Sequence, residues 1–517
     1  MHAYRPPEAM SDKKYYISSF FWSTLSKVLT SIIGFFTVPL LLSVYGKADY
    51  GIIAIATSCN GYMHLLDLGI NNGTVKYYSQ WKAEGKVGLV YSVAKTNITF
   101  YILISIINIL GLVSLGIWGE PLFSISHEQF LTLRTCLFII ALFAMFSWVT
   151  TVFNQLLIAN RQIAFTMRWQ CVQSILKGLL VVAALILDIP MELYFFFLTM
   201  LISLLIFPYL HKCKHDGLID KVKLGWDWHN FGTVLAFSLS LFMLGLFQTT
   251  ATQSRPILLS MFAVNGAETV TEFRIIEVVP QLIIMIGGVA SAIFLPKTSE
   301  MVATGRKEEI KSFAYKWTLL TSILSCVLCF PFMLCAKEVL CAYVGAEYTQ
   351  LSTWMVLWCV TVLIQIHTTP GNSLVLAYGK TKSLVVTSAC SCILSMAVNI
   401  VLCPKYGVGS AVIGYFIYVV IVIGYYYVSY YKKLLHLNRY KMFGSFLRPV
   451  SLAIVATAAV QAIPENWWTT QACTGRMSLI IQCLTKTAFW GTCYMALLYL
   501  TKTLTKSMIT DNNGNLR

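Results

Sequence analysis

Long apolar runs recur along the whole chain and are separated by short polar connections. Each run has about 20 residues or more, which is enough for a helix to cross the hydrocarbon core of a bilayer. No connection is long enough to hold a separate catalytic domain, so an enzyme is not expected. The pattern predicts fourteen membrane-spanning helices, centred on residues 17–44, 50–70, 89–117, 130–157, 163–187, 191–210, 231–262, 268–295, 312–334, 350–375, 383–402, 408–431, 446–463 and 477–501.

Three short segments of the first half return in the second half. The matching pairs are VPLLLS and RPILLS (38–43 and 255–260), YGII and FRII (50–53 and 273–276), and NQLLIA and NSLVLA (154–159 and 372–377). Such repeats in an apolar chain are typical of transporters built from two related halves. Because each half contains six predicted helices, both halves enter the membrane in the same orientation. We therefore expect a pseudo-twofold axis along the membrane normal.

The predicted fold is an all-α polytopic membrane protein with two six-helix lobes and two additional C-terminal helices. Its predicted parts are a cytoplasmic N-terminus (1–15), a first lobe (16–210), a basic cytoplasmic linker (211–230), a second lobe (231–431), accessory helices (432–501) and a cytoplasmic tail (502–517). Met10, which precedes a short polar segment, is an alternative start to Met1.

Composition and charge support a membrane protein. Hydrophobic residues make up 57% of the chain and charged residues 12%, whereas soluble proteins have about 25% charged residues. With the N-terminus inside, the outer loops carry only Lys47, Lys337, Lys405 and Arg476, and the inner loops carry most other basic residues. This asymmetry follows the positive-inside rule and places both termini in the cytoplasm. The net charge of +16 is then explained by topology and by anionic lipid headgroups, without a nucleic-acid partner.

The fifteen cysteines are scattered and lie mostly within predicted helices. Cys326 and Cys329 have the spacing of a metal or redox motif, but they lie in an apolar helix without nearby histidines, so no metal site is expected. Cys335 and Cys341 share a predicted outward-facing loop in which they could approach each other. No disulfide is predicted between them.

Five charged residues lie deep within predicted spans. They are Lys27, Lys177, Arg255, Arg274 and Glu277. A charge at the bilayer centre costs about 2.5–3.5 kcal/mol on insertion scales, so such residues persist when they face water, a partner or a charged ligand. Four cations and one acid favour a polyanionic ligand such as a diphosphate. Arg274 and Glu277 lie one turn apart on one helix face, and a purely structural ion pair is the alternative for them.

Pro39 and Pro256 occupy matching positions in the first helix of each half. Proline removes one backbone hydrogen bond and clashes with the preceding turn, so a bend is expected at both places. The bend is either static or changes during transport.

The Ser18–Trp22 and Gly46–Gly51 segments, the paired prolines and the helix-borne cations resemble the multidrug/oligosaccharidyl-lipid/polysaccharide (MOP) exporter superfamily, and in particular its polysaccharide branch of O-antigen-type flippases. The resemblance implies two lobes as in MATE transporters and MurJ. It also implies a flippase that moves polyprenyl-diphosphate-linked oligosaccharides across the bacterial inner membrane by alternating access, without a cofactor.

In this reading Lys27, Arg255, Arg274 and Lys177 hold the diphosphate. Glu277 positions Arg274 or takes part in proton or sodium coupling. Membrane lipids and polysaccharide polymerase machinery are the expected partners. Two other functions stay open. A peptidoglycan lipid II flippase would match the helix count, but that branch carries arginines on the first helix, where this chain has only Lys27. A multidrug antiporter would need more acidic residues in its cavity than Glu277.

Overall fold

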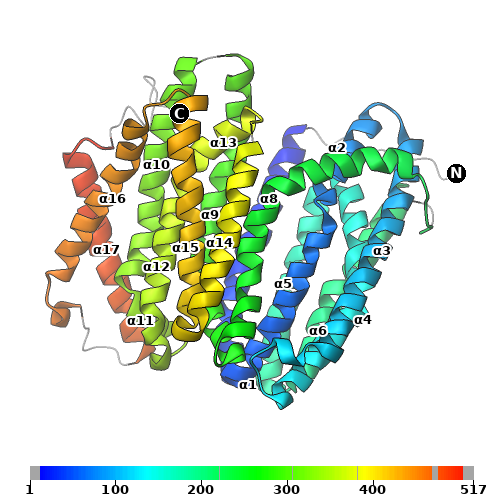
Figure 1. Cartoon of the computed structure of the whole chain (residues 1–517), viewed down its shortest axis with the longest axis horizontal. Coiled ribbons are helices and arrows are strands. Elements are labelled where there is room, and N and C mark those ends of the chain that lie inside the picture. The colour runs from blue at the N-terminus through cyan, green and yellow to red at the C-terminus, as the bar shows by residue number, and fades with distance from the viewer. Residues whose placement is uncertain (1–11, 220–221, 306, 381, 469–474, 505–517) are drawn as a thin grey trace. The chain divides into compact units, whose positions relative to one another are not determined.

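The structure, a computed structural model, describes residues 12–504 except 220–221, 306, 381 and 469–474. The described residues form helices joined by short turns, and no strand occurs among them (Figure 1). A helix satisfies its own backbone hydrogen bonds, which a segment inside lipid must do. The all-α polytopic architecture expected from the sequence is confirmed.

The helices gather into two compact units, Met1–Thr271 and Glu272–Arg517. The helices of the first unit are α1 (Asp12–Met63), η1 (His64–Asp67), α2 (Ile70–Ala83), α3 (Val87–Trp118), η2 (Glu120–Leu122), α4 (His127–Ala159), α5 (Ile163–Leu187), α6 (Met191–Ser203), α7 (Ile206–His215) and α8 (Trp228–Phe262). The boundary between the units falls within α9 (Gly266–Ala303). The lobe and linker boundaries given above stay predictions.

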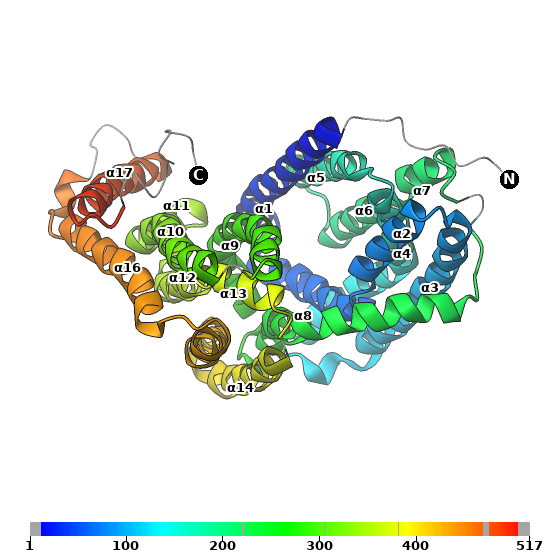
Figure 2. The ribbon, with the colours of Figure 1, turned by 90° about the horizontal axis from the view of Figure 1, so that it is seen from above.

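The helices of the second unit that follow α9 are α10 (Lys307–Leu334), α11 (Ala336–Tyr343), η3 (Ala346–Leu351), α12 (Ser352–Ile366), α13 (Thr369–Ala377), α14 (Lys382–Tyr406), α15 (Val408–Tyr425), η4 (Tyr426–Leu434), α16 (Arg439–Gln461), η5 (Glu465–Trp467) and α17 (Arg476–Leu500). The accessory helices α16 and α17 pack on α10, and α17 also packs on α11 (Figure 2). The indole Nε1 of Trp490 donates to Thr457 Oγ1 at 3.1 Å and joins the two accessory helices.

All fourteen predicted spans fall on helices of the structure. Within the described residues, ten segments are long and apolar enough to cross a bilayer. One of them, Ser18–Asp67, contains two predicted spans, because α1 consists of two helical segments that meet at Gly46. The φ of Gly46 is 76°, a conformation that glycine adopts without steric cost. The predicted span 350–375 is divided into α12 and α13 by a break after Ile366.

In the first unit, α1 and α5 run side by side in the same direction. Their contacts, in chain order, are Tyr15 with Arg161, Trp22 with Arg168, Thr30 with Ser174, Ile33 with Gly178, and Tyr45 with Ile189. The partner on α5, or in the turns that flank it, advances in step with the residue on α1. The two helices therefore keep one register from one end of the unit to the other.

The end of the first unit near Gly46 is held together by polar contacts. Lys47 Nζ lies 3.4 Å from Glu268, and Thr271 Oγ1 donates to the Lys47 carbonyl at 2.7 Å. At 2.8 Å, the Ser124 amide donates to the Ser260 carbonyl. These bonds connect three chain turns that are far apart in sequence.

The opposite end of the first unit carries most of its basic residues. Lys212 pairs with Asp216 at 2.8 Å, and Lys82 donates to Asn160, which in turn donates to Asp216 at 3.3 Å. Burial lowers the pKa of Lys82 to about 8, with Asp216 opposing the shift and Arg161 adding to it.

Candidate functional site

Lys27 on α1 and Lys177 on α5 each lie one helical turn from the Thr30–Ser174 contact between the two helices. Thr30 Oγ1 and Ser174 Oγ are 2.7 Å apart and fix the register between the two lysines. Lys27 lies one turn before Thr30 on α1, and Lys177 lies one turn after Ser174 on α5. With parallel helices, the two positions are separated by roughly 7–9 Å along the helix axes. The lysines therefore mark two levels of one seam.

Neither of these two ammonium groups has a carboxylate partner among the described residues. Lys27 is exposed and Lys177 is half-buried, and the ion pairs of the described residues join other side chains. An unpaired cation at membrane depth is costly. The seam is therefore suited to an anionic group or to water.

Arg255 lies in a different environment, at the proline of α8. Pro256 has no backbone N–H, so the carbonyl of Thr252 loses the hydrogen bond that a helix would normally supply. The Nε of Arg255 donates to this carbonyl at 3.3 Å, and the Arg255 residue is only 2% exposed. The Arg255 side chain thus replaces the backbone hydrogen bond that is missing at Pro256. A bend at Pro39 and at Pro256 stays a prediction, and the break in α1 lies beyond Pro39, at Gly46.

Arg274 and Glu277 form an ion pair in the second unit. The Arg274 Nη1 and the Glu277 Oε2 are 2.5 Å apart. The other Glu277 oxygen accepts a hydrogen bond from Gln281 Nε2 at 3.2 Å. These side chains form a polar line along one face of α9, because residues three and four apart share a face. The Arg274 side chain keeps 26% of its surface exposed, so it can reach a further acceptor while paired.

The structure reveals a buried polar chain in the first unit that the sequence analysis did not assign to a site. Tyr101 donates to Asp67, and Gln155 Nε2 donates to Tyr101 at 3.0 Å. Asn97 Nδ2 donates to Gln155 Oε1 at 2.7 Å. The chain connects η1, α3 and α4, and Asn97, Tyr101 and Gln155 are fully buried. In the sequence, this polar chain is indicated only by Asn97 and Gln155, which lie inside otherwise apolar spans.

In the second unit, His367 and Gln365 connect helices. His367 Nε2 lies 3.0 Å from the Tyr427 hydroxyl, and its ring stacks on Phe446 at 4.0 Å. Tyr415 donates to Gln365 Oε1 at 3.2 Å. Both side chains therefore have partners on neighbouring helices, and no ligand is required to account for their polar groups.

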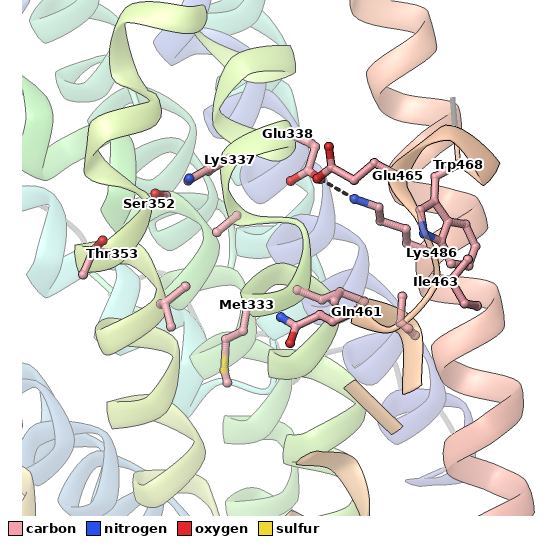
Figure 3. Close-up of a pocket in the computed structure, with 14 residues that line it drawn as sticks. Met333, Lys337, Glu338, Ser352, Thr353, Gln461, Ile463, Glu465, Trp468 and Lys486 are labelled. Carbon is pink, nitrogen blue, oxygen red and sulfur yellow. Dashed lines mark hydrogen bonds and ion pairs between the residues drawn. The ribbon is translucent and has the colours of Figure 1, made fainter. Parts of the chain in front are cut away.

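A cavity of about 420 Å³ lies between the accessory helices and α10–α12 (Figure 3). Lys486 of α17 and Glu338 of α11 point toward each other at 2.6 Å, and Glu465 and Trp468 lie on the accessory side. Lys337 also lines the cavity, which therefore holds two cations and two acids. This balance of charge does not match a diphosphate, so the cavity is not the predicted anion site.

The predicted residues therefore fall into three groups. Lys27 and Lys177 share the α1–α5 seam, Arg255 lies in α8, and Arg274 with Glu277 lies in α9. Their predicted roles toward a diphosphate stay predictions. Within the described ranges, no three His, Cys, Asp or Glu side chains are grouped as metal ligands.

Comparison with known proteins gives one family match and several similar folds. A family model described as polysaccharide biosynthesis protein matches residues 17–301, which is more than half of the chain. The fold is similar to the lipid II flippase MurJ in an inward closed conformation, with a TM-score of 0.71 and 12% identity over 93% of this chain and 100% of that one.

A second similar fold is a multidrug resistance MATE family transporter of the MOP superfamily in an inward-facing conformation. The TM-score is 0.60 and the identity 12%, over 76% of this chain and 92% of that one. No curated protein matches the chain.

Proposed function

Because the chain belongs to the polysaccharide biosynthesis protein family, we propose that it is a flippase for polyprenyl-diphosphate-linked oligosaccharides of the O-antigen or capsule type. It carries the repeat unit across the bacterial inner membrane by alternating access and catalyses no covalent chemistry. Both termini are proposed to lie in the cytoplasm. The gathering of basic residues at the end of the first unit where α1 begins supports this orientation for the N-terminus.

The observation that carries the proposal is the pair of lysines on the α1–α5 seam. Lys27 and Lys177 sit at membrane depth, and no carboxylate of the described residues pairs with them. Two spaced cations match the two phosphates of a diphosphate better than they match a cationic drug. In the second unit, Arg274 is a further cation proposed to bind the substrate, and Glu277 pairs with it at 2.5 Å.

Arg255 belongs to the proposed site with a reduced role. Its role is reduced because its Nε is bound to the Thr252 carbonyl. Glu277 is proposed to orient Arg274 or to couple transport to protons or sodium. A polysaccharide polymerase is the proposed downstream partner.

The test is complementation of a deletion strain. We expect Lys27→Ala combined with Lys177→Ala, and Arg274→Ala alone, to abolish surface polysaccharide at normal protein level, with the lipid-linked intermediate accumulating inside. Lys223→Ala removes an exposed cation outside the candidate spans and serves as the matched control, with wild-type polysaccharide expected. Wild-type polysaccharide in both site variants contradicts the site.

A lipid II flippase is the second candidate function, because the similarity to MurJ extends over 93% of this chain and so includes the accessory region. Rescue of cells depleted of their own lipid II flippase would favour this candidate. A multidrug antiporter would instead change drug susceptibility in the deletion strain while surface polysaccharide stays normal.

A further inference from the structure

The accessory helix α17 is joined to α11 by a nearly enclosed ion pair. Lys486 Nζ lies 2.6 Å from Glu338 Oε1, and the two side chains are only 9% and 19% exposed (Figure 3). An ion pair with so little exposure fixes the register between two helices, because neither charge can move away without losing its partner.

One turn away from this ion pair lie two cysteines. Cys335 immediately precedes α11, three residues before Glu338, and Cys483 lies three residues before Lys486 on α17. Residues three apart share a helix face, so the register that pairs Lys486 with Glu338 also brings Cys483 to Cys335. The two thiols lie within hydrogen-bonding reach of each other. The sequence had placed Cys341, and not Cys483, near Cys335.

The two thiols differ in their exposure. Cys335 is 1% exposed, and Cys483 is half-buried. Ala336, the residue after Cys335, lines the cavity together with Glu338 and Lys486. In the proposed orientation this end of α17 is on the outer side of the membrane, where disulfides form and persist.

We propose that Cys335 and Cys483 form a disulfide that ties α17 covalently to the α10–α11 junction. The placement of the pair outside the cytoplasm rests on the orientation given under the proposed function. On oxidation each thiol loses one proton and the pair gives up two electrons as the new sulfur–sulfur bond forms. The electrons reduce the disulfide of a protein thiol oxidase or of oxidised glutathione, which leaves as two thiols.

The bridge closes a loop that contains α11 through α16, and it supplements the ion pair one turn away. A loop of this length restricts the unfolded chain strongly. The accessory helices are thereby kept on the second unit even when contacts elsewhere change.

The test is peptide mapping of the full-length protein, extracted from membranes in the presence of a thiol-blocking reagent and digested with trypsin without reduction. We expect peptide 317–337, which contains Cys335, to be linked to peptide 477–486, which contains Cys483. The link should disappear in Cys335→Ser and in Cys483→Ser. It should persist in Cys329→Ser, a matched control within the same first peptide.

The proposal is overturned by two findings together. Cys335 and Cys483 of the wild-type protein both carry the thiol-blocking reagent, and no linked peptide forms even after membranes are treated with oxidised glutathione. A link from peptide 317–337 to peptide 338–380, which contains Cys341, also overturns it. Neither result depends on transport. If the disulfide is absent but surface polysaccharide is normal, only the disulfide proposal fails. If the disulfide is present but the protein does not support surface polysaccharide, only the proposed function fails.

Discussion

Arg255 illustrates how a single side chain can serve the backbone of a transport helix. A deep arginine next to a proline suggested an anion-binding residue. In the structure the Nε of Arg255 instead donates to the carbonyl of Thr252, which loses its backbone donor because residue 256 is proline. The sequence placed both residues correctly but could not show the direction of the side chain, because rotamer and burial depend on the packing of α8.

Arg255→Ala should lower the stability of the detergent-solubilised protein, because it leaves the half-buried Thr252 carbonyl without this donor, a loss of about 1–3 kcal/mol. In a Pro256→Ala background the new backbone N–H of residue 256 can bond to Thr252. Arg255→Ala should therefore cost less there, which a double-mutant cycle in thermal unfolding would detect. Equal costs in both backgrounds would contradict the proline-repair role.

Lys82 gives a pH-dependent prediction. Its pKa is lowered to about 8 in the folded protein by burial, from an ordinary value of 10.5. Between these two values the unfolded state binds more protons than the folded state, so stability should rise with pH across this window. The melting temperature of wild type relative to Lys82→Met should therefore increase from pH 7.5 to pH 10. A decrease over the same range would refute the lowered pKa.

At the scale of helices, Gly51 shows why the two halves differ where the repeats align. A Cβ on Gly51 would overlap the carbonyl oxygen of Ala267 and lie 2.9 Å from Thr271 Oγ1. The second segment of α1 can thus approach the start of α9 only because residue 51 has no side chain. At the aligned position the second half carries Arg274, so a packing position in one half bears a charge in the other.

Gly51→Ala should destabilise the protein by about 1–3 kcal/mol, the usual range for overpacking. Gly34→Ala, in the same helix but with no atom within 4 Å of the added Cβ, should be neutral or stabilising. Thermal unfolding of the two variants in the same detergent measures the difference. Equal melting temperatures would mean that α1 and α9 are not in this close contact.

Prediction from sequence worked best for helices and least well for contacts between them. The fourteen apolar spans are all helical because span length and hydropathy are local properties. The Arg274–Glu277 pair could also be predicted from the sequence, since it depends only on helix periodicity. The Asp67–Tyr101–Gln155–Asn97 chain and the Cys335–Cys483 contact were not, because each depends on how distant helices pack.

For the whole molecule, the expected resemblance to the MOP exporter superfamily and its polysaccharide branch is confirmed by the family match over residues 17–301 and by the MurJ-like and MATE-like fold. The fold itself does not select a substrate, because related architectures host different transported molecules. The cations of the α1–α5 seam and Arg274 are therefore the proposed determinants of substrate choice.

The most direct measurement is a flipping assay with purified protein in liposomes that contain the polyprenyl-diphosphate-linked oligosaccharide. A membrane-impermeant reagent that oxidises sugars reads how much substrate is exposed on the outer leaflet. We expect wild-type protein to bring the inner-leaflet pool to the reagent, and the Lys27→Ala, Lys177→Ala double variant to do so at least tenfold more slowly while remaining folded. Folded wild-type protein that exposes no more substrate than protein-free liposomes would contradict the flippase assignment.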